Sequence, residues 1–252
     1  MNSQKLNGYK ENGVTTFSVA SVFEHIPFLQ KKIAALFQNK NKVRPWHLWD
    51  LHNPWGASAL NVDSWKFLDL CQSAELLEQI AQLIGDDIIL YDSQFSPDLS
   101  EMNQLPLSWT TDSLRCPVEP QSGLVVRIPF TDSINEDLKF VYHTEGDINK
   151  TDQIHEQSLE IKTGQILCHD INLYYRIEGI EQLKQPMEYV IRYYPATSHY
   201  VRDQTTKLHR NLTELFPLLN YAQMPLWLVR GEDKADNDFV TGFQPKAGRW
   251  IT

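Results

Sequence analysis

The sequence predicts an α+β protein with a jelly-roll-like core of antiparallel strands and with flanking helices. Two observations lead to this prediction. Apolar residues recur at helical spacing in the first third of the chain, and short segments rich in β-branched and aromatic residues follow. Helices that precede many antiparallel-looking strands are typical of a barrel or sandwich with a helical flank.

Three helices are expected from apolar residues spaced three and four apart. The first covers 21–38, and Pro27 is an alternative first residue because proline is tolerated in the first turn of a helix. The second covers 65–83 and is expected to end at Gly85, since glycine favours the position that follows a helix. The third covers 203–219.

The remaining elements are expected to be strands. They are short, rich in β-branched and aromatic residues, and bounded by clusters of Asp, Asn, Gly and Pro. The predicted strands are 87–95, 123–130, 138–143, 164–177, 188–194 and 225–230.

The chain is expected to fold as one domain, because no repeat, low-complexity tract or Gly/Ser-rich linker divides its 252 residues. Within it, we expect residues 1–62 to form an N-terminal helix and an aromatic lid segment. Residues 63–200 would form the core, and residues 201–252 a C-terminal helix and a closing strand. The contents of 42% apolar and 22% charged residues are those of a globular protein, which excludes wholesale disorder.

Charge and cysteine content narrow the classes of partner. The 23 Lys and Arg against 32 Asp and Glu give a formal charge of −9, which argues against a nucleic-acid-binding surface. No apolar run approaches the ~18 residues of a membrane span, and the polar N-terminus lacks the apolar core of a secretory signal. Three widely spaced cysteines without a CxxC pair favour neither disulfides nor zinc. We therefore expect a cytoplasmic protein whose partner is a small molecule, and the oligomeric state stays open.

Three segments of the chain carry a family resemblance. Residues 65–95 end in ELLEQIAQLIGDDIILYDSQF, a helix that leads into a strand. Residues 107–147 read LSWTTDSLRCPVEPQSGLVVRIPFTDSINEDLKFVYHTEGD, and residues 163–196 read TGQILCHDINLYYRIEGIEQLKQPMEYVIRYYPA. In order and spacing they resemble the entry, the ligand-bearing strand and the closing strands of the phytanoyl-CoA dioxygenase-like family. The resemblance implies a double-stranded β-helix (cupin-like) core within the Fe(II)/2-oxoglutarate oxygenase superfamily.

The residues at the family's metal positions depart from its pattern. Its members hold Fe(II) with a His-x-Asp motif and a distal His, which leaves positions open for 2-oxoglutarate and oxygen. Here the motif reads Thr110-Thr111-Asp112, and the distal His position falls at Tyr174. Pro186 stands where a basic residue would bind the co-substrate. The resemblance therefore implies degenerate metal and co-substrate motifs, and we expect no cofactor.

One alternative keeps the metal. A shifted register would let His169 serve with Asp112 as an iron ligand, and Fe(II) and 2-oxoglutarate would then be the cofactors. Against this shift, the run GQILCHD resembles the family's strand in which a His precedes the ligand without being it. A further pair with ligand spacing, His143 and Glu145, is better explained as a strand end followed by a polar turn.

Arg127 and Arg192 each stand in the middle of an apolar strand. Alternation along a strand places Arg127 on the face of Val125 and opposite Val126 and Ile128. Because an unpaired guanidinium is costly to bury, each arginine must face either water or a partner. Facing inwards, they would bind a substrate carboxylate; facing outwards, Arg127 would pair with a surface Asp or Glu. Both orientations stay open for Arg127, whereas the resemblance favours a pocket edge for Arg192.

Aromatic residues are expected to enclose the substrate. The run RPWHLWDLHNPW, residues 44–55, is a proline-bounded segment that we interpret as a pocket lid, with Trp49 and His52 as substrate contacts. A chemical role for Asp50 and His52 is a less favoured alternative. Trp109, three residues before Asp112, is a further expected contact.

These residues lead to one favoured function and two alternatives. The favoured function is an enzyme of specialised metabolism that has lost the iron triad and converts an anionic small molecule by acid–base or templating chemistry. Asp112, with a pKa raised by burial, would be the general base, and Tyr174 or Tyr175 would donate a hydrogen bond or a proton. Arg127 and Arg192 would bind the substrate. The alternatives are an Fe(II)/2-oxoglutarate-dependent oxygenase with substituted ligands and a non-catalytic binding protein.

Overall fold

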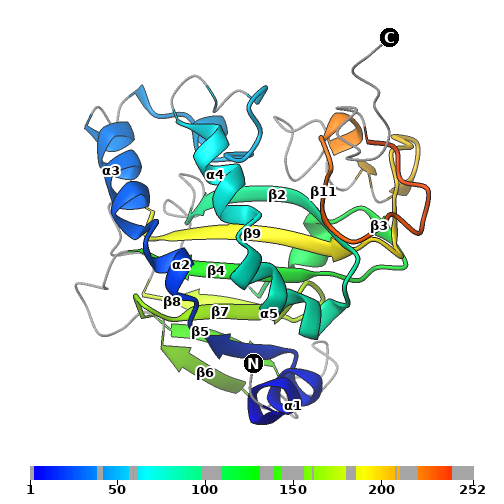
Figure 1. The fold of residues 1–252 in the computed structure, drawn as a ribbon, viewed down its shortest axis with the longest axis horizontal. Helices are drawn as coiled ribbons and strands as arrows, with labels where there is room; N and C mark the ends of the chain where they lie inside the picture. Colours follow the sequence, from blue (N-terminus) through cyan, green and yellow to red (C-terminus); the bar gives the residue numbers. More distant parts are fainter. Residues whose placement is uncertain are drawn as a thin grey trace.

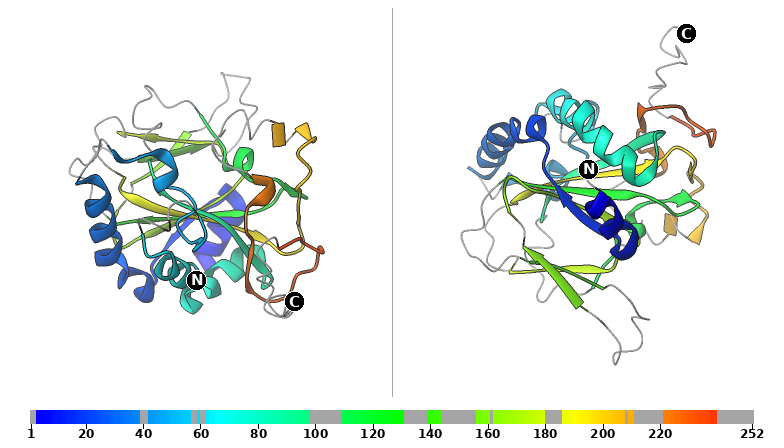
Figure 2. Two further views of the ribbon diagram at one scale, coloured as in Figure 1. Left: turned by 90° about the horizontal axis from the view of Figure 1, so that it is seen from above. Right: turned by 60° about the horizontal axis from the view of Figure 1, so that its bottom comes forward.

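Two antiparallel sheets lie one above the other, and helices cover the outer face of the larger sheet (Figure 1; Figure 2, right). This is the predicted α+β architecture with a double-stranded β-helix core. The structure is a computed structural model that describes residues 3–38, 42–56, 59, 62–97, 109–130, 139–143, 156–160, 162–179, 186–207, 209–210 and 221–239.

The helices differ from the predicted ones in their boundaries. The first predicted helix is divided in two, and Pro27 lies in the first turn of the second piece. The helix predicted over 65–83 is divided near Gln72, and its end at Gly85 is confirmed. The helix predicted over 203–219 falls largely outside the described residues. The α-helices are α1 Ser3–Asn12, α2 Ala20–Phe23, α3 Ile26–Phe37, α4 Ser64–Cys71 and α5 Ala74–Ile84, and the 3-10 helices are η2 Pro45–His47, η5 Asp112–Arg115 and η8 Tyr221–Gln223.

Strands occupy all six segments predicted to be extended. The segment 164–177 contains two strands, which belong to different sheets. The strands are β1 Val14–Phe17, β2 Ile88–Ser96, β3 Val118–Glu119, β4 Leu124–Pro129, β5 Lys139–His143, β6 Glu156–Glu160, β7 Ile166–Asp170, β8 Tyr175–Glu178, β9 Glu188–Pro195, β10 His199–Tyr200 and β11 Trp227–Arg230. The large sheet has the order β1-β7-β4-β9-β2-β11, the small sheet has the order β6-β5-β8, and β10 pairs with β3.

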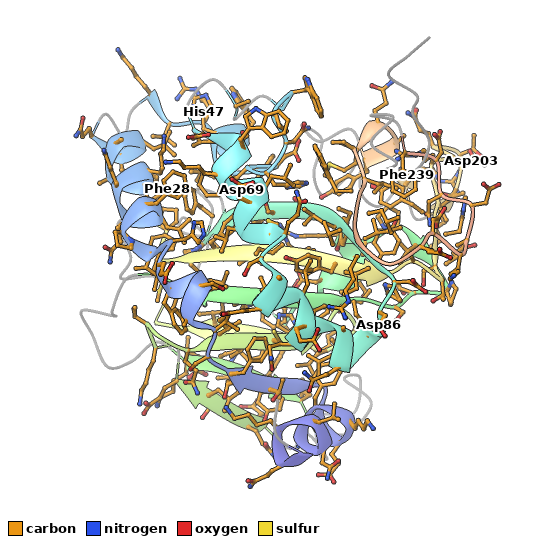
Figure 3. The ribbon with its side chains drawn as sticks, viewed as in Figure 1. Phe28, His47, Asp69, Asp86, Asp203 and Phe239 are labelled. Carbon is orange, nitrogen blue, oxygen red and sulfur yellow. The ribbon has the colours of Figure 1, made fainter. Side chains whose placement is uncertain are left out.

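The helix-covered face of the large sheet carries the main apolar core. Phe28 of α3 lies toward α4 (Figure 3), where its ring centroid is 5.1 Å from that of Phe67. Phe67 in turn lies 5.1 Å from the ring of Tyr189 on β9. Leu124 and Ile128 of β4 belong to the same cluster. The apolar side chains of the helices and those on one face of the strands therefore pack together in one core.

The opposite face of the large sheet looks toward the small sheet. Val125 and Arg127 of β4 point to this side because successive side chains of a strand alternate between faces. Arg127 is 2% exposed, so its inward orientation is confirmed and the outward alternative is wrong. Of the described residues, no helix is both long enough and apolar enough to pass through a lipid bilayer.

Candidate active site

Ionisable side chains gather between the two sheets. Strands β2, β4, β7 and β9 contribute them from the large sheet, β8 from the small sheet and η5 from the connection between β2 and β3. Each is at most 8% exposed, so water does not screen the charges that they carry. We call this set the buried charge network; its members are Asp92, Asp112, Arg127, His169, Tyr175, Glu188 and Arg192.

Arg192 joins two carboxylates. Its Nε and Nη2 atoms lie 2.7 and 2.6 Å from Oδ1 of Asp112, and its Nη1 donates to Oδ2 of Asp92 at 2.7 Å. Asp92 stands directly opposite Arg192 in the β2–β9 pairing, which fixes this contact. Burial alone would lower the pKa of Arg192, but the two carboxylates outweigh it and keep the guanidinium charged.

Arg127 joins both sheets. Its Nη1 donates to Oε2 of Glu188 at 2.8 Å, and its Nη2 donates to the Tyr175 hydroxyl at 2.7 Å. The guanidinium carbon also lies 4.8 Å from the centre of the Tyr175 ring, a cation–π distance. The third contact is from Nε to Nε2 of His169, at 3.3 Å. Both arginines are therefore bound by groups of the chain itself.

The contacts of His169 define its tautomer. Nδ1 lies 3.0 Å from the backbone oxygen of Asp170, which can only accept, so Nδ1 carries the proton. Nε2 is then the acceptor for Arg127 Nε–H. Burial lowers the pKa of His169 to about 3, against the opposing effect of Asp112, so the ring is neutral at pH 7.

Asp112 and His169 face each other with two acceptor atoms. Oδ2 of Asp112 lies 3.7 Å from Nε2 of His169, and this oxygen is buried with no hydrogen-bond partner among the described residues. A buried carboxylate oxygen without a donor is costly. Oδ2 of Asp112 is therefore suited to accept a hydrogen bond from a further donor, whereas Nε2 of His169 already accepts one from Arg127.

The pKa expected for Asp112 is wrong in direction. Burial does act to raise it, but Arg192, His169 and Arg127 together hold the pKa of this carboxyl well below its usual range. Asp112 is thus a stable anion and a weak base. The pKa of His169 is also low, at about 3, so neither group is a strong base while Arg127 occupies Nε2.

Of the two expected tyrosines, only one belongs to the network. Tyr175 is buried and opens β8, opposite Tyr142 of β5. Tyr174 is 40% exposed, so the inward placement that we expected for its side chain is wrong. Thr110, at the first position of the degenerate motif, is also exposed.

The expected aromatic contacts lie away from the network. Trp109 packs on the outer side of the small sheet, 3.6 Å from the His143 ring and 4.4 Å from the Arg176 guanidinium. Trp49 belongs to the core on the helix-covered face of the large sheet. His52 is buried, and its Nδ1 lies 2.9 Å from the hydroxyl of Ser93 on β2. Because neither Trp49 nor His52 reaches the inner face, the segment 44–55 does not cover the network as the lid interpretation requires.

Two members of the network were missed in the sequence. Glu188 lies four residues before Arg192 on the same strand, and alternation places both side chains on one face. Asp92 stands in an apolar strand, where a charge requires a buried partner. A register shift between Leu90 and Asp92 directs this side chain inward, and no sequence pattern reveals that shift.

The family resemblance implies a ferrous ion, which needs three protein ligands. Among the described residues, no group of three or more His, Cys, Asp or Glu side chains is placed to hold a metal ion. Asp112 and His169 offer two donors, but Arg127 already binds Nε2 and Arg192 binds the same carboxylate. In the part of the chain that the structure describes, two donors with two guanidinium cations beside them do not fit a site that needs three ligands.

Comparisons with known proteins identify the fold. No protein-family model matches the chain, and no curated protein sequence does. Solved structures do match. CytC3 with Fe(II) and α-ketoglutarate has a TM-score of 0.60 at 14% identity, over 95% of this chain and 93% of its own.

Two further matches come from nogalamycin biosynthesis. The non-heme α-ketoglutarate-dependent carbocyclase SnoK has a TM-score of 0.59 at 12% identity, over 79% of this chain and 86% of its own. The non-heme α-ketoglutarate-dependent epimerase SnoN has a TM-score of 0.56 at 12% identity, over 78% of this chain and 83% of its own. The chain is therefore similar in fold to non-heme α-ketoglutarate-dependent enzymes.

Proposed function

We propose that this protein is an enzyme of specialised metabolism that converts a small molecule by non-oxidative acid–base chemistry, without iron or 2-oxoglutarate. The observation that supports this proposal is the pair of acceptor atoms between the sheets, Oδ2 of Asp112 and Nε2 of His169, 3.7 Å apart. Both atoms are buried. Oδ2 of Asp112 has no hydrogen-bond partner among the described residues, and Nε2 of His169 accepts from Nε–H of Arg127.

The proposed chemistry is a proton transfer to His169. The neutral imidazole takes a proton from the substrate at Nε2, in place of the hydrogen bond from Arg127. Movement of the Arg127 cation away from the ring, with Asp112 still beside it, raises the pKa of His169 and makes the ring a stronger base. Asp112 remains an anion and stabilises the imidazolium that forms. Arg127 and the Tyr175 hydroxyl stabilise the electron pair left on the substrate. Return of the proton to another face or atom of the substrate gives an epimer or an isomer.

The comparisons support this reading in part. The similar structures include an epimerase and a carbocyclase, so this fold hosts reactions other than hydroxylation. Both of those enzymes depend on α-ketoglutarate. We propose a different chemistry here because the guanidinium groups of Arg127 and Arg192 contact His169 and Asp112.

The substrate is proposed to carry a hydrogen-bond donor at the atom that meets Asp112 and His169. Arg127 and Arg192 already bind carboxylates of the chain, so they offer a substrate carboxylate no unoccupied cation. That the substrate carries a carboxylate therefore stays a prediction. The proposed partner is thus a small molecule.

A second candidate is an Fe(II)/2-oxoglutarate-dependent oxygenase. The orphaned oxygen of Asp112 beside His169 favours it, since both atoms are metal-ligand types. It requires a further ligand and the displacement of Arg127 from Nε2.

Proton exchange and metal content separate the candidates. The metal-stripped protein is incubated in D2O with a panel of hydroxy, keto and amino acids, and mass spectrometry detects deuterium in each recovered compound. We expect deuterium incorporation or isomerisation by the wild type in the presence of EDTA, and its loss in His169→Gln but not in His199→Gln, which removes an exposed histidine. Stoichiometric iron with succinate formation from 2-oxoglutarate, both lost in His169→Gln, would establish the oxygenase instead. Equal exchange by wild type and His169→Gln would refute the role of His169.

A further inference from the structure

A surface cleft of about 380 Å³ lies apart from the buried charge network. Helix α1, the end of α5, the last residue of β5 and the segment after β7 form its walls. In Figure 1, α1 lies at the lower edge of the molecule, beside β1. A volume of this size is within the range of small-molecule sites.

Two opposite charges line the cleft without pairing. Lys10, on the last turn of α1, forms no ion pair with any described carboxylate. Among the described residues, the carboxylate of Asp170, at the end of β7, accepts hydrogen bonds only from the backbone N and the side-chain Nδ2 of Asn172, at 2.8 and 3.1 Å. The anion is therefore oriented by its own loop, and none of the described Lys or Arg side chains forms an ion pair with it.

The position of Asp170 is fixed by its surroundings. Its backbone N–H donates to the oxygen of Gly13 at 2.8 Å, and Gly13 has a φ of +69° that favours glycine. A Cβ at Gly13 would lie 3.7 Å from the Asp170 Cβ and 3.5 Å from Leu173. Helix α1 and the β7 end thus meet closely and hold the carboxylate at the cleft wall.

The rest of the wall is mixed: three leucines stand beside the polar groups of Tyr9, Asn12, His143 and Asn172. Leu6, Leu83 and Leu173 contribute aliphatic surface. His143 lines the cleft with a ring held against Trp109, and neither ring nitrogen has a hydrogen-bond partner among the described residues. Both nitrogens are buried, so the ring adds surface to the wall without an accessible hydrogen-bonding atom.

From these features we propose that the cleft binds a small zwitterion with an apolar side chain, that is, a free amino acid of the leucine, methionine or phenylalanine type. The ammonium group pairs with Asp170, the carboxylate pairs with Lys10, and the side chain contacts the three leucines. This site does not depend on the acid–base function proposed for the network, since it shares no side chain with it.

The test uses L-leucine, L-methionine and L-phenylalanine as probes, in calorimetric titrations of the full chain. Two analogues of leucine each lack one charge: 4-methylpentanoate has no amine, and 3-methylbutylamine has no carboxylate. We expect saturable binding of at least one amino acid and at least tenfold weaker binding of its singly charged analogues. Absence of saturable binding for all three amino acids, or equal binding of either analogue, overturns the proposal.

Variants locate the binding. Lys10→Met should weaken it at least tenfold and leave folding unchanged, because the exposed Lys10 forms no described ion pair. Lys31→Met, an exposed lysine on α3, is the matched control and should bind as the wild type does. Asp170→Asn should also weaken binding tenfold, and a circular dichroism spectrum shows whether that variant folds. Wild-type affinity in Lys10→Met overturns the site. Amino acid binding and deuterium exchange are measured separately on the wild type, so failure here and failure of the proposed catalysis are distinguishable.

Discussion

Arg192 binds Asp112 through one carboxylate oxygen only: Nε and Nη2 both reach Oδ1, at 2.7 and 2.6 Å. In a fork-to-fork pair each oxygen would receive one N–H group. Here the second oxygen, Oδ2, remains directed toward His169 at 3.7 Å. Arg192 therefore fixes the charge and position of Asp112 and leaves one of its oxygens available.

The first prediction concerns the stability that this contact provides. Arg192→Met removes the cation from between two buried carboxylates, Asp92 and Asp112. We expect the free energy of unfolding to fall by about 3–5 kcal/mol, because the remaining charges stay buried without compensation. Urea denaturation at pH 7 measures this change.

A surface arginine provides the control. Arg176 also contacts two carboxylates, Glu156 and Glu178, at 3.0 and 2.8 Å, but both carboxylates are 44% exposed. Arg176→Met should therefore cost less than about 1 kcal/mol. Equal losses in the two variants would show that burial does not set the value of the Arg192 contacts.

The second prediction separates the neighbouring tyrosines. Tyr175→Phe removes a hydrogen bond to the charged Arg127 and should lower the free energy of unfolding by about 1.5–3 kcal/mol. Tyr174→Phe alters an exposed side chain and should change it by less than about 0.5 kcal/mol. Denaturant titrations of both variants test the difference. A larger loss in Tyr174→Phe would place Tyr174, and not Tyr175, in the interior.

The strands of the large sheet were predictable because their side chains obey a two-residue alternation. That rule alone gave the correct face for Arg127 relative to Val126 and Ile128. Strand β6 was not predicted, because its sequence EQSLE is mostly exposed and has no apolar face to recognise. Helix α1 was missed for the same reason: its sequence SQKLNGYKEN is polar on most of its surface.

The sequence predicted several charged residues of the site, but it did not predict which of them pair with each other. An arginine within an apolar strand signals a buried partner, but the sequence does not say which carboxylate provides it. Asp112 reaches Arg192 across 80 residues, and Glu188 reaches Arg127 across 61. The choice between Tyr174 and Tyr175 depends on one residue of register at the start of β8, which the pairing of Tyr175 with Thr110 and with Tyr142 reveals.

The third prediction concerns the cysteines. Cys71, Cys116 and Cys168 are free and fully buried. Burial raises the pKa of Cys71 and of Cys116 to about 12, so the reactive thiolate is nearly absent at pH 8. We expect no reaction with Ellman's reagent in the native protein and three thiols in guanidinium chloride. Rapid native reaction of any one of them would show that its surroundings open to water.

The last prediction follows from the protonation of His169. Its pKa is about 3 in the folded state, because burial disfavours the charged ring more than Asp112 favours it, and about 6.5 in an unfolded chain. Between these values the unfolded state binds more protons than the folded state does. The contribution of His169 to stability is therefore lost progressively as the pH falls from 6.5 toward 3.

Between pH 7 and pH 5 this loss amounts to about 2 kcal/mol for one histidine with these pKa values. The variant His169→Gln cannot take up that proton when it unfolds. Its free energy of unfolding should therefore fall by about 2 kcal/mol less than that of the wild type over the same interval. Urea titrations of both proteins at the two pH values measure the difference, and His199→Gln controls for the removal of an exposed histidine. If wild type and His169→Gln lose the same stability between pH 7 and pH 5, His169 already carries its proton in the folded protein. It could not then act as the acceptor, because Nε2 would have no free electron pair.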